Sequence, residues 1–223
     1  MKLVLFDLDN TLLPIDSDYE WGQFLVNSGA IDSKSFKQQN DLFFSEYLNG
    51  TLDPIKYLNF SLEILSKFKK KELDDLQSQF MKEIILPVIL PSAVQLVNSH
   101  NKRNNLIIMI TATNSFIAHP IAKAFGIDNL IAANPEVNSQ GKITGNLIGK
   151  PNFKFGKIIN LIDWLKSKKK SFKDFEKVIF YSDSHNDIPL LSIVSEPVAT
   201  NPNEALSKHA KIYGWKIIKL FND

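Results

Sequence analysis

The chain has 223 residues, enough for one large domain or for a core with a smaller second unit. Its 44% hydrophobic and 22% charged residues are typical of a protein with a substantial buried core, and they exclude a disordered chain. The net charge is only +2, and Arg103 is the sole arginine. Because proteins that read nucleic acids favour arginine for bidentate contacts, we expect no nucleic-acid partner.

The chain contains no cysteine, which excludes disulfides and zinc–thiolate sites and fits a reducing compartment. One lysine and a short apolar stretch precede Asp7, too little for a signal peptide. No apolar run approaches the length of a membrane span, and Pro87 interrupts the run from Ile84 to Leu90. We therefore expect a cytoplasmic protein without a membrane partner, present as a monomer or homodimer.

The first predicted element is a short buried strand that begins with Leu3-Val4-Leu5 and ends near Leu8. Residues 14–90 then show helical patterns and no strand. Ser17 and Glu20 have the spacing of a capping box with Ser17 as the N-cap, and Gly29 ends that helix. Further helices are expected at 33–50, from the cap and proline pair Asp53-Pro54 through Leu65, and over Leu73–Ile84.

After Pro91, helices and strands alternate along the chain. The predicted elements are a helix at 92–101, a strand at Leu106–Ile110, a helix at Ser115–Phe125, a short strand at Leu130–Ala132, a hairpin at Val137–Leu147, a helix at Phe153–Lys168, and strands at 178–181, near Val198 and at Lys216–Leu220. The predicted fold is a doubly wound, parallel-sheet, Rossmann-like α/β core (residues 1–13 and 91–223), into which a small all-helical cap (residues 14–90) is inserted.

Two aspartates, Asp7 and Asp9, directly follow the first predicted strand and precede Thr11. Two carboxylates so close repel each other, and a hard cation such as Mg²⁺, which prefers oxygen ligands, relieves that repulsion. A carboxylate beside such a cation is able to attack phosphorus and form an acyl phosphate. The alternative interpretation is an Asp-rich turn that caps the next helix.

A second acidic turn follows the predicted strand at 178–181 and contains Asp183, Asn186 and Asp187. In an open α/β sheet, ligands bind at the carboxyl ends of parallel strands, so both acidic turns are expected at one site. The four histidines have no metal-ligand spacing, and His185 is interpreted as a loop residue with a small chance of contacting substrate.

FDLDNT at 6–11, SDSHND at 182–187, a strand ending in Thr111 and a lysine between them resemble the phosphatases of the haloacid dehalogenase superfamily. The chain is most similar to the phosphoserine phosphatase branch, and within it to members labelled histidinol-phosphatase, which act in amino-acid biosynthesis. The resemblance covers essentially the whole chain. It implies a phosphatase with a small helical cap between the first two motifs.

The resemblance also implies roles for the acidic residues. Asp7 would be the nucleophile that takes the phosphoryl group, and Asp9 would protonate the leaving oxygen and then deprotonate the attacking water. Mg²⁺ would be held by an Asp7 oxygen, the backbone carbonyl of Asp9 and Asp183. Asn186 and Asp187 would lie one layer further out, orienting waters and the loop.

Two further positions bind phosphate in the family. Thr111 resembles the hydroxyl of the second motif, although Thr111, Thr113 and Asn114 all equally suit the N-cap of the following helix. For the lysine that balances the charge of phosphate and Asp7, Lys150, Lys154 and Lys157 compete. Lys157 is preferred, with Lys154 in reserve, because the sub-branch places its lysine after a glycine, as in Gly156-Lys157. An exposed helical lysine is the alternative for either.

The substrate prediction is a small amine-bearing phosphomonoester. Acids just after the first motif contact the substrate amine in phosphoserine phosphatases, and Asp16, Asp18 and Glu20 lie in the matching region. The usual Glu pair is replaced by Leu12-Leu13-Pro14, which shifts the prediction from L-phosphoserine toward L-histidinol phosphate. Phosphoryl transfer to another acceptor, as in mutases, and a non-catalytic phosphate-binding protein are the alternatives.

Overall fold

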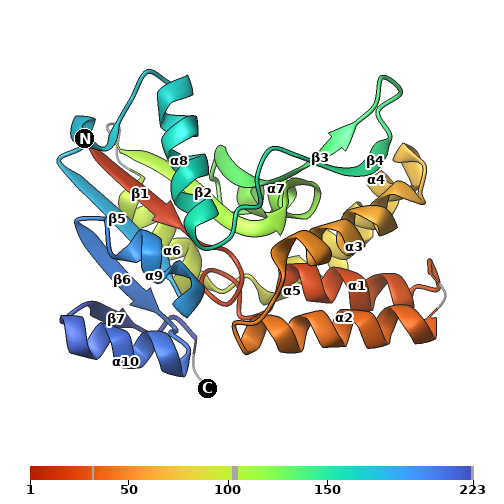
Figure 1. The fold of residues 1–223 in the computed structure, drawn as a ribbon, viewed down its shortest axis with the longest axis horizontal. Coiled ribbons are helices and arrows are strands. Elements are labelled where there is room, and N and C mark those ends of the chain that lie inside the picture. Colours follow the sequence, from red (N-terminus) through yellow and green to blue (C-terminus); the bar gives the residue numbers. More distant parts are fainter. Residues whose placement is uncertain (32, 102–104, 222–223) are drawn as a thin grey trace.

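This computed structural model describes residues 1–31, 33–101 and 105–221, and these form a seven-stranded sheet of order β4-β3-β2-β1-β5-β6-β7 (Figure 1). All neighbouring strands pair in parallel except β3 and β4, which are antiparallel. The strands are β1 (Lys2–Phe6), β2 (Leu106–Asn114), β3 (Asn129–Val137), β4 (Ile143–Ile148), β5 (Lys177–Ser182), β6 (Glu196–Thr200) and β7 (Lys216–Ile218).

Helices cover both faces of this sheet, which confirms the doubly wound α/β prediction. Successive side chains of β1 alternate between the faces: Leu3 and Leu5 join one apolar cluster, and Val4 and Phe6 join the other. The first cluster is completed by α8 (Phe155–Ser167), α9 (Ile188–Leu191) and α10 (Glu204–Tyr213), and the second by α6 (Pro91–His100) and α7 (Ser115–Ala124). Burial on both faces explains the unbroken apolar runs of the central strands.

The described part of residues 14–90 contains helices and no strand, as predicted. The helices are α1 (Ser17–Asn27), α2 (Ser33–Leu48), α3 (Pro54–Ser66), α4 (Lys70–Phe80), the π-helical η1 (Met81–Ile85) and α5 (Leu86–Val88). Asp53 caps α3 as expected, with its side chain accepting from the backbone N–H groups of Ile55 and Lys56. In Figure 1, α1, α2 and α3 lie beside the sheet rather than over its middle.

The predicted capping box of α1 is wrong. The N-cap is Asp16, whose carboxylate accepts hydrogen bonds from the N–H groups of Asp18 and Tyr19. Ser17 is instead the first helical residue, and its hydroxyl donates to Asp9. Aspartate is as good an N-cap residue as serine, so the local sequence allows either Asp16 or Ser17 to cap the helix. The hydrogen bond from Ser17 to Asp9, eight residues away, favours Asp16 as the cap.

The helical segment shares its apolar core with the sheet. Trp21 of α1 packs edge-on against Phe80 of α4 and Phe116 of α7, with ring centroids 5.1 and 5.6 Å apart. The same cluster continues to Val4 and Phe6 of β1. The predicted boundaries of a separate cap at residues 14–90 therefore stay a prediction.

Two strands are longer than predicted. β2 continues past Ile110 to Asn114, with an irregular register against β3 between these residues. β3 continues into the predicted hairpin with β4, whose turn includes Gly141 at φ 77°.

Arg103 lies outside the described residues. Among the described residues, no single helix is long and apolar enough to cross a membrane. Two helical segments, Lys70–Val88 and Pro91–His100, have together the length and composition of a membrane span, but they meet at an angle of 91°.

Candidate active site

The two acidic turns meet at one edge of the sheet. Asp7 directly follows β1 and Asp183 directly follows β5, and these strands are parallel neighbours. β2 flanks β1 on the other side and contributes Thr111 and Thr113. Because the carboxyl ends of parallel strands share an edge, these side chains line or border a single cavity.

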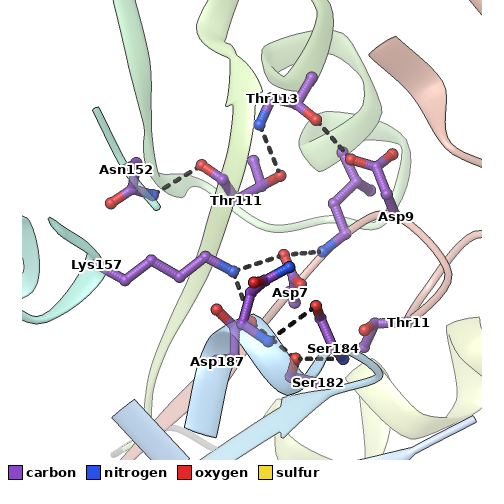
Figure 2. A network of polar contacts seen from close by, with 12 residues as sticks. Asp7, Asp9, Thr11, Thr111, Thr113, Asn152, Lys157, Ser182, Ser184 and Asp187 are labelled. Carbon is purple, nitrogen blue, oxygen red and sulfur yellow. Dashed lines mark hydrogen bonds and ion pairs between the residues drawn. The ribbon is translucent and has the colours of Figure 1, made fainter. Parts of the chain in front are cut away.

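Asp7, Lys157 and Asp187 form a buried ionic cluster (Figure 2). The Lys157 Nζ lies 3.1 Å from Asp7 Oδ1 and 2.7 Å from Asp187 Oδ2, and Ser182 Oγ donates to the same Asp187 oxygen at 2.7 Å. Burial alone would lower the pKa of Lys157, but the two carboxylates outweigh it and raise that pKa, so the lysine stays charged. Asp187 therefore forms an ion pair with Lys157, whereas the sequence analysis expected it to orient waters and the loop.

The other lysine candidates lie elsewhere. Lys150 is exposed, and Lys154 Nζ donates to the Gly50 carbonyl at 3.3 Å. Lys157 reaches Asp7 because α8 begins close to the preceding loop: a Cβ on Gly156 would lie 2.1 Å from the Pro151 carbonyl oxygen. The Gly-Lys pair noted in the sequence is therefore a close backbone approach that only glycine permits.

Asp9 is held by three hydrogen bonds. Its Oδ1 accepts from the Ser17 backbone at 2.7 Å and from the Ser17 hydroxyl at 2.5 Å, and its Oδ2 accepts from the Thr113 hydroxyl. Burial raises the pKa of Asp9, while the bonds from Ser17 and Thr113 act in the opposite direction. A carboxyl with a raised pKa and a fixed orientation is suited to giving and taking protons.

Asp183 is anchored to the first motif through Thr11. The Thr11 hydroxyl donates to Asp183 Oδ1 at 3.0 Å and accepts from the Asp183 N–H at 3.0 Å. Burial raises the pKa of Asp183 to about 7, and the charge of Asp187 adds to this. Burial likewise raises the pKa of Asp7 well above its usual value, as do the neighbouring carboxylates Asp187, Asp183 and Asp9. These carboxylates would be ionised readily only beside a further positive charge.

The oxygens at this edge fit a magnesium ion. No three His, Cys, Asp or Glu side chains of the described residues are grouped to hold a metal, which excludes an all-side-chain cage there. Mg²⁺ instead takes one or two carboxylates, keeps several waters and binds substrate phosphate. Asp7 and Asp183 would supply the carboxylates. The buried Asn186 amide, whose Oδ1 and Nδ2 have no hydrogen-bond partner in the described structure, is consistent with a polar ligand or water beside it.

Thr111 lies beside the acids, as predicted. It does not end its strand, because β2 continues to Asn114. Its hydroxyl oxygen accepts from the Thr113 N–H at 3.1 Å, which leaves its O–H to donate into the cavity. Asn152 donates to the Thr111 carbonyl at 2.7 Å and to the Ile131 carbonyl at 3.0 Å, and thereby ties β2 to β3 behind the site. The N-cap of α7 is Asn114, so capping does not compete for Thr111.

The three predicted substrate acids separate in the structure. Asp16 lines the cavity but is occupied as the N-cap of α1, and Glu20 is not among the described residues that line it. Asp18 lines the cavity, and its Oδ1 accepts from Asn114 Nδ2 at 3.2 Å. Its Oδ2 makes no ordinary hydrogen bond to a described residue, although the hydroxyls of Tyr57 and Ser61 lie near the carboxylate. Burial raises the pKa of Asp18 to about 7.

Sequence reasoning missed the aromatic wall of the cavity and several hydroxyls. The wall comes mainly from the helical segment and comprises Tyr19, Phe43, Phe44, Tyr47, Tyr57 and Phe153. Trp21, two residues after Tyr19, packs in the core. The missed hydroxyls are those of Thr11, Ser17, Thr113, Ser182 and Ser184. Thr11 lies inside the first motif and Ser182 and Ser184 lie inside SDSHND at 182–187, whereas Ser17 and Thr113 were considered only as helix caps.

A model of the haloacid dehalogenase-like hydrolases matches residues 4–192. The chain belongs to this family. It is 44% identical to a histidinol-phosphatase from Neisseria meningitidis serogroup C (strain 8013), an alignment that covers 97% of this chain and 98% of the relative. Family and relative together identify it as a phosphatase.

Solved structures agree on the fold. A protein of unknown function from Bordetella pertussis Tohama I superposes with a TM-score of 0.93 at 40% identity, covering 99% of both chains. A phosphoserine phosphatase bearing a phospho-aspartyl intermediate analogue superposes with a TM-score of 0.67 at 18% identity, covering 100% of this chain and 94% of that one. The second likeness shows a shared fold.

Proposed function

We propose that this phosphatase is Mg²⁺-dependent and hydrolyses a small amine-bearing phosphomonoester, L-histidinol phosphate first, through an aspartyl-phosphate intermediate. The observation on which this rests is the charge of the cavity. Among the described residues that line it, the carboxylates are Asp7, Asp9, Asp16, Asp18 and Asp187, and the cation is Lys157, already paired with Asp7 and Asp187.

The proposed reaction uses the residues at the sheet edge. An Asp7 carboxylate oxygen attacks phosphorus and forms the Asp7 O–P bond, while the ester P–O bond breaks and Asp9 gives its proton to the leaving alkoxide. Asp9 then takes a proton from water, whose oxygen attacks phosphorus and releases Asp7 and inorganic phosphate. Thr111 and Lys157 would bind the phosphoryl oxygens throughout.

Mg²⁺, held by Asp7, the Asp9 carbonyl and Asp183, would offset the charge of the phosphate and the carboxylates. Asn186 would complete the surroundings of the ion, and Asp187 would hold Lys157 in place through its 2.7 Å contact. The raised pKa of Asp9 supports its assignment as the acid, because burial favours the protonated form that an acid needs.

Substrate charge supports histidinol phosphate over phosphoserine. Both carry an ammonium group, which would pair with the Asp18 carboxylate that lines the cavity. Phosphoserine also carries a carboxylate, and no lining residue in the described structure offers it an unpaired cation. A buried, unpaired carboxylate is costly, so the cavity favours an amine without one. The stacked Tyr19 and Phe44, with ring centroids 4.4 Å apart, present aromatic surface suited to an imidazole.

The helical residues 14–90 would act as a cap that shelters this substrate. They supply most of the aromatic wall and Asp18, whereas the strands supply the acids of the proposed chemistry. A small metabolite suits such a chamber better than a protein or nucleic-acid end.

The deciding experiment compares kcat/KM, with Mg²⁺ present, for L-histidinol phosphate, L-phosphoserine, glucose 6-phosphate and an aryl phosphate. We expect histidinol phosphate to be hydrolysed fastest. Faster hydrolysis of phosphoserine would overturn the charge argument, and equal rates for glucose 6-phosphate and both amines would overturn amine selection altogether. Phosphoryl transfer to an added alcohol without phosphate release would favour the phosphotransferase alternative.

A further inference from the structure

The end of α2 touches the loop that contains Asp183. Tyr47, in the last turn of α2, lies near the hydroxyl of Ser184, and both residues line the cavity. Three residues further on, Gly50 lies directly against the ring of His185. Lys154, just before α8, donates to the Gly50 carbonyl at 3.3 Å. One short segment of the helical region therefore meets two catalytic-edge loops.

The fit between Gly50 and His185 depends on the missing side chain of glycine. Gly50 has φ +71°, and a Cβ built on it would lie 2.6 Å from His185 Nε2 and 3.5 Å from Cε1. The 2.6 Å distance is well inside van der Waals contact, so an added Cβ would require the His185 ring or one of the two loops to shift.

The His185 ring has a second contact, which opposes its turning away from Gly50. Its Nδ1 is 3.0 Å from the Asn203 Nδ2. Asn203 is itself fixed, because its side chain caps α10 by accepting from Leu206 N–H, and its backbone N–H donates to the Asp183 carbonyl. Ser184 is fixed in a similar way, since its hydroxyl accepts from the Asn186 N–H. His185, which Gly50 contacts, is therefore linked through Asn203 to Asp183, a residue proposed to hold the metal.

We propose that Gly50 and His185 form a positioning contact, which aligns loop 183–187 with the helical wall of the cavity. The inference rests on the proposed phosphatase function of the same site. It assigns a role to His185 as a rigid stop rather than as a substrate ligand, and to Lys154 as a tether for Gly50 rather than as the phosphate lysine. Misalignment of this loop would displace Asp183 and Asn186 relative to Asp7.

Gly50→Ala tests the contact, and Gly29→Ala is its matched control. Gly29 ends α1 with φ +73°, yet nothing lies within 4 Å of the Cβ that it would gain. Both variants therefore carry the same backbone strain and only one carries the clash. We expect Gly50→Ala to lower kcat/KM for the best substrate by about 10- to 100-fold. Gly29→Ala should leave kcat/KM near that of the wild type while lowering the melting temperature to a similar extent.

Removal of the stop should rescue the defect. In a His185→Ala background, Gly50→Ala should cost less than about threefold in kcat/KM, because the added methyl then has space. A Gly50→Ala penalty of equal size in both backgrounds would overturn the proposal, and so would a Gly29→Ala variant as impaired as Gly50→Ala.

Hydrogen exchange supplies a readout that needs no substrate. Gly50→Ala should raise amide exchange in both segments 47–52 and 183–187, and the double variant should restore protection of segment 183–187. If this exchange coupling is seen while no phosphomonoester is hydrolysed, the contact stands and the proposed function fails. If substrates are hydrolysed and the exchange of segment 183–187 is unchanged, the contact fails and the function stands.

Discussion

The two halves of the cavity partner their carboxylates differently. At the sheet edge, Asp7 and Asp187 share the buried cation Lys157, and Asp9 accepts three hydrogen bonds. On the helical side, Asp18 keeps an oxygen without an ordinary hydrogen bond, and aromatic rings surround it. The sheet edge is thus preorganised for a fixed reaction, whereas the helical side leaves an acceptor open for whatever ligand enters.

This difference separates chemistry from selectivity. Changes at the sheet edge should impair turnover of every phosphomonoester to a similar degree, because all of them share the phosphoryl group. Changes on the helical side should act on one class of substrate and leave a simple aryl phosphate almost unaffected. The predictions below test this division, beginning with the largest expected effect.

Asp7→Asn should lower kcat for all substrates by at least about 1,000-fold, because the amide cannot attack phosphorus. The shape of the side chain is retained, so the circular dichroism spectrum and cooperative unfolding should persist. Steady-state kinetics with histidinol phosphate and an aryl phosphate would measure the loss. Wild-type turnover by a verified variant would disprove the covalent mechanism.

Exhaustive treatment with EDTA should abolish activity, and Mg²⁺ should restore it, because the proposed ligands are hard oxygens. Ca²⁺ should restore little, since its larger and more flexible shell suits the site poorly. Phosphate release before and after readdition is the measurement, with the aryl phosphate included to exclude an effect on substrate binding alone. Full activity in the chelated protein would refute the metal requirement.

Lys157→Met should destabilise the protein as well as inactivate it, because it leaves Asp7 and Asp187 buried without their cation. Breaking such a buried pair costs about 3 kcal/mol or more, which urea-induced unfolding would detect. Lys150→Met is the matched control, since that lysine is exposed. An unfolding free energy equal in the two variants would show that the buried cluster contributes little.

Asp18→Asn should raise KM for the amine substrate by about 10- to 100-fold and change KM for an aryl phosphate by much less. Glu20→Gln, a neighbouring acid outside the cavity lining, is the control and should behave like the wild type. Equal effects of both variants on the amine substrate would refute the role of Asp18.

The same residue predicts a pH dependence. Burial raises the pKa of Asp18 to about 7, so below that pH the free enzyme holds it neutral and unable to pair with an ammonium group. The ratio of kcat/KM for amine over aryl substrate should therefore rise as pH increases through 7, and Asp18→Asn should flatten the ratio. Because the folded-state pKa is raised, ionisation costs stability as pH rises through it, and Asp18→Asn should unfold less readily than wild type above pH 7.

The sequence by itself determined the sheet edge well. Each strand that delivers an acid is a continuous apolar run, and parallel pairing places the carboxyl ends of such runs together without further information. The placement of Asp7 and Asp183 at one edge was expected in this way, whereas Thr111 was named from the family resemblance. Lys157 was preferred over Lys154 because of its glycine neighbour, and the close approach of Gly156 to the Pro151 carbonyl gives that pattern its physical basis.

Only the tertiary structure decided what the helical segment does. The spacing of Ser17 and Glu20 predicted a capping box, because the capping pattern considers only four consecutive residues. It could not include Asp9, to which the Ser17 hydroxyl is hydrogen-bonded. Likewise, no local pattern joins Gly50 to His185, or Asp18 to Asn114, since these pairs are far apart in sequence. Apolar periodicity identifies which face of a helix is buried, but the polar contacts at its end depend on where the packed helix lies.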